Sequence, residues 1–347
     1  MRSHEATARL CQYARTVSQK SKVKSQNCDT HYAECFGFRH FVKYMRNIST
    51  YHAGELAVQA QAGVQTEAAH LTKIIGASIN PTARDFLRTQ RLAIASTIDK
   101  HGKVWASLLT GKPGFVQVVA EQFVQVQATC GKIPNSDFTI PNSIDIGILV
   151  IDLATRRRLR INGKAELKQN RRINVQTQQV YFNCPKYIQT RDLVAESDRQ
   201  TAIPEVYSYT ALTPAQQQWI TQADTFFIAS FHPQSGADAS HRGGYPGFVQ
   251  VLNEAELVFP DYAGNNMFNT LGNISEYPQI GLLLVDFVYG HTLQLTGTAN
   301  IIWDTNRIAQ FIGAERLVEV HIDWVLETTH ATNLCWELAE YSPYNPK

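Results

Sequence analysis

The chain has little of several features that mark large protein classes. Its 347 residues include six cysteines and no CxxC pair, so we expect reduced thiols and neither a disulfide scaffold nor a zinc knuckle. No segment approaches the roughly 18 consecutive apolar residues needed to cross a bilayer, and residues 1–20 lack the apolar stretch of a secretory signal peptide. The sequence therefore predicts a cytoplasmic protein with no membrane partner.

Excess positive charge is confined to the N-terminal region. Residues 1–46 hold nine Lys and Arg against three Asp and Glu, whereas the remainder holds 23 against 27. A mildly acidic body argues against nucleic acid as a partner. Paired histidine and carboxylate spacing is also missing, which disfavours a metallohydrolase, and we predict no metal site.

Residues 1–50 form a basic N-terminal extension unlike the rest of the chain. Three interpretations compete: a disordered tail, an organelle-targeting peptide, or upstream sequence wrongly included in the reading frame. We favour the third, because Met45 stands immediately before the first segment with the pattern of a folded protein.

An internal repeat organises the remainder. Residues 105–118 (WASLLTGKPGFVQV) and 238–251 (DASHRGGYPGFVQV) share nine of fourteen residues at an offset of 133. The same offset, within one residue, aligns further pairs: IAS at 94–96 with IAS at 228–230, and 146–165 with 280–299. Self-similarity over this length indicates two copies of one structural unit.

Each copy is expected to begin with a helix. Asn80-Pro81 and Thr213-Pro214 place a capping side chain before a proline in the first helical turn, which is a helix-start signal. The amphipathic spacing of residues 52–76 also predicts helix. The predicted organisation is a helical lead-in at 51–79, a first β domain at 80–195, a second at 213–330 and a C-terminal tail at 331–347.

The strands predict the fold class. Short segments rich in Val, Ile, Leu and Phe, separated by Gly, Pro, Asn and Asp clusters, are typical of an antiparallel sheet or barrel. Residues 149–167 and 282–301 each have the pattern of a hairpin. Long helices do not alternate with these strands, so we predict a mainly β fold with helical decorations, built as a pair of small barrels.

Two polar segments of the second copy are candidates for a phosphate site. In SHRGGYPGF (240–248), Arg242 can form a bidentate ion pair while the glycines let backbone N–H groups approach closely. A solvated polar turn would have the same composition. In PDYAGNNMFNTLGNI (260–274), a helix that carries Met267, Phe268 and Leu271 is expected to start among polar residues, and a helix N-terminus attracts anions. The alternative is an N-capped helix with surplus asparagines.

The two copies differ at these segments. At the positions of His241 and Arg242 the first copy has Leu108 and Leu109, and no counterpart of NNMFNTLGN precedes Gly147. The first copy instead carries VYFNCPKYIQTR (180–191), which the second does not repeat. Its Lys186 and Arg191 could add positive charge and its Tyr187 a stacking face, although the end of a solvated hairpin would look similar.

At these residues the sequence resembles the pyridoxamine 5'-phosphate oxidase-like family of FMN-binding split barrels, in particular its larger two-domain members. The likeness spans about residues 51–330 and rests on several motifs in one order: YHAGELAVQAQAG, VWASLLTGKPGFV, NCPKYIQTR, FHPQSGADASHRGGYPGFVQV and PDYAGNNMFNTLGNI. The arginine and histidine pattern with which authentic pyridoxamine phosphate oxidases bind substrate is absent near either C-terminal region. The family name therefore does not predict that reaction.

The resemblance implies two tandem antiparallel split barrels of Greek-key type, which form a pseudo-dimer within one chain and hold FMN in the groove between them. Only one of the two pseudo-equivalent sites would be complete. The residues implied to bind the cofactor are Ser240, His241, Arg242, Asn266, Asn269 and Thr270 from the second copy, with Lys186 and Tyr187 from the first.

The leading functional interpretation is an FMN-dependent oxidoreductase. It would pass electrons or hydride from a reduced donor, such as a nicotinamide, to an unidentified small-molecule acceptor. Because a cofactor carries such chemistry, no catalytic residue need stand out, and none can be assigned. The alternatives are a flavin carrier or sensor without turnover, and haem or a deazaflavin in the same barrel; haem would need an axial ligand such as His232, His241 or His321. A further alternative for the assembly is a homodimer of these pseudo-dimers.

Overall fold

Two helices begin at the caps that the sequence predicts. The computed structural model describes residues 50–128, 143–168, 172–196 and 203–347, so all but the last residue of the predicted extension lies outside it. Helix α5 (Pro81–Thr89) follows Asn80, whose side chain accepts a hydrogen bond from the amide of Ala83. Helix α6 (Pro214–Gln222) follows Thr213, which forms a capping box with Gln216.

The lead-in is helical, as predicted, but not continuous. It contains α3 (Ala53–Gln61), α4 (Gln65–Leu71) and the 3-10 turn η1 (Thr72–Ile74). The first helix ends near Gly63, whose φ of 72° is a left-handed conformation that terminates helices. The amphipathic spacing correctly predicted helix but missed the break between α3 and α4. Such spacing depends on where apolar side chains lie and does not show where the backbone leaves the helical conformation.

The first copy forms an antiparallel sheet. Its strands are β1 (Leu92–Ile98), β2 (Val104–Thr110), β3 (Val116–Ala120), β4 (Phe123–Gln127), β5 (Ile144–Asp152), β6 (Arg157–Lys168) and β7 (Arg172–Asn183). Their spatial order is β2-β1-β5-β6-β7-β4-β3. The predicted hairpin over 149–167 is confirmed as the β5–β6 pair.

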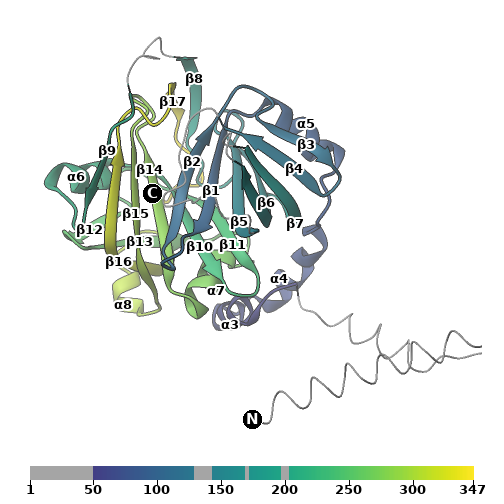
Figure 1. Ribbon diagram of the computed structural model, residues 1–347. Coiled ribbons are helices and arrows are strands. Elements are labelled where there is room, and N and C mark those ends of the chain that lie inside the picture. Colours follow the sequence, from purple (N-terminus) through teal and green to yellow (C-terminus); the bar gives the residue numbers. More distant parts are fainter. Residues whose placement is uncertain (1–49, 129–142, 169–171, 197–202) are drawn as a thin grey trace, which may run out of the picture. The chain divides into compact units, whose positions relative to one another are not determined.

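The second copy repeats this sheet. Its strands are β10 (Thr225–His232), β11 (Gly236–Gly243), β12 (Gln250–Asn253), β13 (Glu256–Tyr262), β14 (Gln279–Val285), β15 (Thr292–Ile302) and β16 (Ala314–Thr328). The order β11-β10-β14-β15-β16-β13-β12 matches the first sheet position by position, and β9 (Val206–Tyr209) is added beside β16. Figure 1 shows the two sheets side by side.

These sheets confirm the predicted mainly β, antiparallel class with few helices. The hairpin predicted over 282–301 is present as β14–β15. The hydrogen-bonded path of each sheet is open at its ends. Closure into split barrels and the domain limits 80–195 and 213–330 therefore stay predictions.

The strand register corrects one part of the repeat. Gly147 lies opposite Ser96, whereas its counterpart Gly281 lies opposite Ala229. The counterpart of Ser96 is therefore Ala229 and not Ser230, so the match between the two IAS segments is displaced by one residue. Such a displacement would move every side chain to the opposite face of the sheet. Sequence identity over three small residues was too short to fix the register.

An apolar cluster between the two sheets joins the copies. The first sheet contributes Leu92, Ile94, Leu149 and Ile151, and the second contributes Phe227, Ala229, Leu283 and Val285. Each sheet has a separate core on its other face. Because buried apolar surface drives this association, Thr50–Lys347 form one compact unit.

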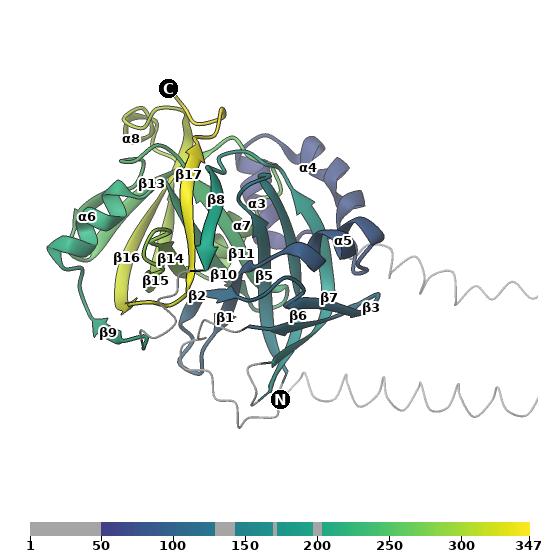
Figure 2. The same ribbon diagram turned by 90° about the horizontal axis from the view of Figure 1, so that it is seen from above.

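The remaining elements connect the copies at their margins. Strands β8 (Thr190–Glu196) and β17 (Leu334–Glu340) form a separate antiparallel pair that links the end of the first copy to the predicted tail. Helix α7 (Asn269–Glu276) packs against α3, as Figure 2 shows, and α8 (Thr305–Ile308) precedes β16. In the part of the chain that the structure describes, no helix is long and apolar enough to span a membrane.

The close approach of the sheets depends on two glycines at counterpart positions. A Cβ on Gly147 would lie 2.7 Å from the Cα of Asp238, and a Cβ on Gly281 would lie 2.8 Å from the Cα of Trp105. We expect Gly281→Ala to lower the free energy of unfolding by about 1–3 kcal/mol, because neither backbone can yield without separating the sheets. Denaturant unfolding measures this. The control is Gly76→Ala, where a Cβ meets nothing within 4 Å; equal, small effects of both would contradict the close packing.

Candidate functional site

A cavity lies where the two copies meet, with about 870 Å³ of empty space that is partly open to solvent. Its walls come from β6 and the segment after β7 in the first copy, and from β11, β13 and the loop into α7 in the second. All eight residues that the sequence assigned to a cofactor line this one cavity: Lys186, Tyr187, Ser240, His241, Arg242, Asn266, Asn269 and Thr270.

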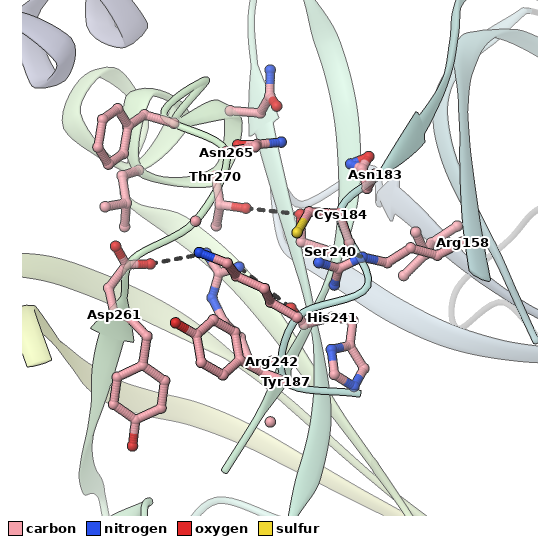
Figure 3. Close-up of a pocket in the computed structure, with 18 of the residues that line it drawn as sticks. Arg158, Asn183, Cys184, Tyr187, Ser240, His241, Arg242, Asp261, Asn265 and Thr270 are labelled. Atoms are coloured by element: carbon pink, nitrogen blue, oxygen red, sulfur yellow. Dashed lines mark hydrogen bonds and ion pairs between the residues drawn. The ribbon is translucent and has the colours of Figure 1, made fainter. Parts of the chain in front are cut away.

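Strand β11 carries the predicted triplet, which therefore does not lie in a solvated turn, the alternative that the composition left open. Ser240, His241 and Arg242 lie inside the strand, so alternate side chains point to opposite faces. Figure 3 shows Arg242 reaching toward Asp261, and the hydroxyl of Thr270 directed at Ser240. His241 is buried and packs edge-on against Phe227 at 5.7 Å between ring centroids.

The imidazole of His241 has no hydrogen-bond partner on either ring nitrogen among the described residues. Burial lowers its pKa well below the usual value, and the charges of Arg158, Arg242 and Arg191 lower it further. The ring is therefore neutral at physiological pH.

Helix α7 begins later than the sequence predicts. Its first residue is Asn269, so Met267 and Phe268 precede the helix instead of lying on it. Phe268 and Asn266 have φ of 59° and 60°, a left-handed conformation that is uncommon outside glycine. Tyr187 from the first copy has φ of 65°. Backbone strain of this kind is concentrated at ligand sites. The local sequence did not predict these left-handed conformations.

The buried guanidinium of Arg160 connects the two copies at the cavity. Nη1 donates to the hydroxyl of Tyr181 and to Oδ1 of Asn269, each at 2.7 Å, and Nη2 donates to Oγ of Ser240. Nε lies 3.0 Å from Oδ1 of Asp238. Although burial alone would lower the pKa of Arg160, Asp238 and Tyr181 raise it above its usual value. The side chain is therefore a permanent cation that holds residues of both copies.

A carboxyl from the lead-in orients Asn269. Glu55 on α3 is 5% exposed and accepts a hydrogen bond of 2.6 Å from Nδ2 of Asn269. Since Oδ1 of Asn269 accepts from Arg160, both ends of this amide are engaged by the protein. Burial raises the pKa of Glu55 to about 7 and Asp238 adds to the rise, against hydrogen bonds from His52 and Asn269 that lower it.

Cations outnumber carboxylates on the cavity wall. The described lining residues include Arg158, Arg160, Lys186 and Arg242, and one carboxylate, Asp261. That carboxylate is shared, lying 3.4 Å from Arg242 and 2.9 Å from Arg316 behind the wall. An anion entering the cavity would therefore meet unbalanced positive charge.

Arg158 is one source of this imbalance. Its Nε donates to the carbonyl of Cys184 at 2.9 Å, and no described carboxylate forms an ion pair with it. Burial lowers the pKa of Arg158 to about 9, with the charges of Arg160 and Arg242 acting in the same direction. A negatively charged ligand would favour the charged form of Arg158 and offset the repulsion from Arg160 and Arg242.

Sequence reasoning missed Arg158, Arg160 and Glu55. A signal for the arginines exists in RRRLR (156–160), because alternation along a strand puts Arg158 and Arg160 on one face. The face that meets the second copy could not be read from this run. Arg191, which the sequence suggested as added positive charge, is buried in an ion pair with Asp224 and does not line the cavity.

The second, pseudo-equivalent site between the copies has no counterpart of the Arg160 charge. Strand pairing makes Gln294 the counterpart of Arg160 and Ser107 the counterpart of Ser240. Nε2 of Gln294 donates to the carbonyl of Ala106 at 2.8 Å and lies 3.3 Å from Oγ of Ser107. The stretch ahead of Gly147, where the sequence shows no second NNMFNTLGN, includes residues 129–142 outside the described ones.

The histidines considered for haem have other surroundings. His232 stacks on His52 at 3.9 Å, and its Nδ1 accepts hydrogen bonds from the amides of Gln234 and Ser235. His321 is exposed on β16, and neither it nor His232 lines the cavity. Among the residues with described positions, no cluster of three or more histidine, cysteine or carboxylate side chains is placed to hold a metal ion.

The fold and the cavity define an antiparallel β protein with a repeated sheet and a cation-lined site between the copies. Residues 212–333 match the sequence profile of the family described as Pyridoxamine 5'-phosphate oxidase. The match confirms, for this stretch, the resemblance to the pyridoxamine 5'-phosphate oxidase-like family that the motifs indicated. A search of curated proteins found no match.

Solved structures with similarity to the chain each cover about a third of it. HupZ of Group A Streptococcus is 10% identical over 32% of this chain and 90% of its own, with a TM-score of 0.26. A general stress protein 26-related protein of the pyridoxinephosphate oxidase family, from Clostridium acetobutylicum, is 10% identical over 35% and 89%, with a TM-score of 0.26. The FAD binding protein from Mycobacterium smegmatis is 13% identical over 35% and 98%, with a TM-score of 0.26.

The raised pKa of Glu55 predicts a pH-dependent stability. Folding raises this pKa from 4.5 to about 7, so its contribution is fully present below pH 4.5 and is lost as the pH rises through 7. Compared with Glu55→Gln, the wild type is expected to lose up to about 3 kcal/mol of unfolding free energy between pH 5 and pH 8. Denaturant titrations at both values measure the difference. Glu67→Gln, at an exposed position on α4, is the control and should show no such trend; a parallel trend in both variants would refute the assignment.

Proposed function

We propose that the cavity binds FMN and that the protein is an FMN-dependent oxidoreductase, which passes electrons or hydride from a reduced donor such as a nicotinamide to a small-molecule acceptor. The proposal extends the family assignment of residues 212–333. The observation that carries it is the lining of one cavity by Arg158, Arg242 and Lys186 with Asp261 as the counter-charge. In the same proposal, the copies are split barrels over 80–195 and 213–330 that form a pseudo-dimer with one complete site.

The donor set fits a phosphate. Arg158 and Arg242 offer planar guanidinium groups, which pair with phosphate oxygens in a bidentate manner, and Lys186 adds a point charge. Nε of Arg242 is buried and has no hydrogen-bond partner among the described residues. Burial lowers the pKa of Arg242 while Asp261 partly restores it. A phosphate dianion would supply the negative charge that Arg242 lacks, because its one described carboxylate partner, Asp261, is shared with Arg316.

The other predicted residues take supporting places in this arrangement. Thr270 and the amide of Asn266 would meet the ribityl chain, and the ring of Tyr187 would lie beside the bound cofactor. Ser240 and Asn269 both accept hydrogen bonds from Arg160 and would fix the geometry of the cavity wall. Bound FMN supplies reversible hydride and electron transfer, while the chain binds it, orients it and limits its access to water.

FMN binding is expected to depend on the two cavity arginines. Arg158→Ala and Arg242→Ala should each weaken FMN affinity about 10- to 100-fold, since a hydrogen bond to a charged group contributes about 1.5–3 kcal/mol. Flavin fluorescence during titration of the apo-protein measures the affinity. Riboflavin, which lacks the phosphate, should bind the variants and the wild type almost equally.

Arg157→Ala is the matched control, because Arg157 immediately precedes Arg158 on β6 and its guanidinium lies over Phe86 and Phe182 on the other face. It should retain FMN. Undiminished FMN affinity in both Arg158→Ala and Arg242→Ala would overturn the phosphate site. A haem absorption band in the purified protein, in place of a flavin spectrum, would overturn the cofactor.

Turnover separates an enzyme from a flavin carrier or sensor. We expect FMN-loaded protein to oxidise NADH or NADPH steadily with oxygen or a quinone as acceptor. Arg242→Ala should lose this activity in proportion to its FMN occupancy and recover it at saturating FMN. Stable FMN binding without oxidation of either nucleotide would favour the carrier.

A further inference from the structure

The segment 342–347 packs behind the cavity wall, although the sequence suggested only a tail. Ser342 and Asn345 are 1% and 3% exposed. The amide of Tyr187 donates to Oγ of Ser342 at 3.2 Å. The ammonium of Lys186 lies 5.9 Å from the ring centroid of Tyr344. Both residues that the first copy contributes to the predicted site therefore touch this segment.

One buried amide joins three stretches of chain behind the wall. Gln189 is fully buried, and its Oε1 accepts hydrogen bonds from the amide of Ser342 at 2.7 Å and from Nδ2 of Asn345 at 3.1 Å. Its Nε2 lies 3.2 Å from the backbone oxygens of both Tyr187 and Gly244. The segment 342–345, the segment after β7 and the end of β11 thus share one side chain.

The wall that this amide supports is strained. Tyr187 is held in the left-handed region, a conformation that a large side chain keeps only when the surroundings impose it. Its backbone oxygen would lie 2.1 Å from a Cβ on Gly243, beside Arg242. Its hydroxyl donates to the carbonyl of Ala263 at 2.9 Å, in the loop of the second copy. Tyr187 therefore spans the cavity from one copy to the other.

We propose that Ser342 and Asn345 are positioning residues that act through Gln189 on Lys186 and Tyr187 and so set the affinity of the cavity for a phosphate-bearing ligand. This inference rests on the proposed function where it names FMN as that ligand. Loss of the Asn345 amide removes a donor from Gln189 and loosens the support of the left-handed Tyr187. Lys186 is then free to move away from the anion.

The test measures FMN and riboflavin affinity in parallel. Asn345→Ala is expected to weaken FMN binding about fivefold, the effect of losing one hydrogen bond of about 1 kcal/mol, and to weaken riboflavin binding less. Combined with Lys186→Ala, it should add little to the effect of Lys186→Ala alone, because both changes act on one contact. Ser342→Ala is the second variant and should act in the same direction, since it removes the acceptor of the Tyr187 amide.

A general loss of stability would give a different result. Thr332→Val is the control, because Thr332 is buried between β16 and β17 and its Oγ1 lies 3.0 Å from Oγ1 of Thr110, away from the cavity. It should lower the melting temperature without changing the ratio of FMN to riboflavin affinity. The same ratio in Asn345→Ala and the wild type, or independent effects of Asn345→Ala and Lys186→Ala, would overturn the inference.

Hydrogen exchange of residues 184–189 tests the positioning without any flavin. Exchange in the ligand-free protein should be faster in Asn345→Ala than in the wild type, and equal rates would overturn the inference. If the wild type binds neither FMN nor riboflavin, the proposed function fails, whereas exchange still decides whether Asn345 positions the wall.

Discussion

The buried guanidinium of Arg160 is the contact on which the cavity depends. It extends from β6 of the first copy to Ser240 and Asp238 of the second, and through Asn269 it reaches Glu55 of the lead-in. A buried cation is expensive to desolvate, and removing one partner of such a pair costs about 3–5 kcal/mol. The positions of both sheets and of helix α3 around the cavity therefore depend on the partners of one buried charge, that of Arg160.

The duplication places two pseudo-equivalent surfaces in contact, and a few strand positions make them different. Gln294 repeats the contact of Arg160 with a serine, but as an amide it needs no buried carboxylate and attracts no anion. Leu109 stands where the second copy has Arg242 and belongs to the core of its own sheet. The repeated apolar positions thus maintain the scaffold, while charge at the non-repeated ones defines the cavity.

Segments outside the two repeated sheets complete the site. Glu55 orients an amide at the start of α7, and the segment 342–345 supports the loop that carries Tyr187. The segment 342–345 holds Tyr187 in its left-handed conformation. Glu55 holds the amide of Asn269 in the orientation that accepts a hydrogen bond from Arg160. Rigid support of this kind keeps donors in place before a ligand arrives, which reduces the entropy lost on binding.

Features with local causes were predictable from the sequence. The caps at Asn80 and Thr213 and the two hairpins follow from neighbouring residues, and the repeat follows from sequence identity between the copies. The eight side chains that the family resemblance assigned to a cofactor line one cavity. Only the tertiary structure decided the roles of Arg158 and Arg160, the late start of α7 and the one-residue correction of the repeat. These depend on contacts such as that between Arg160 and Ser240, 80 residues apart. Periodicity and capping are properties of short segments, whereas charge balance is a property of the groups that folding brings together.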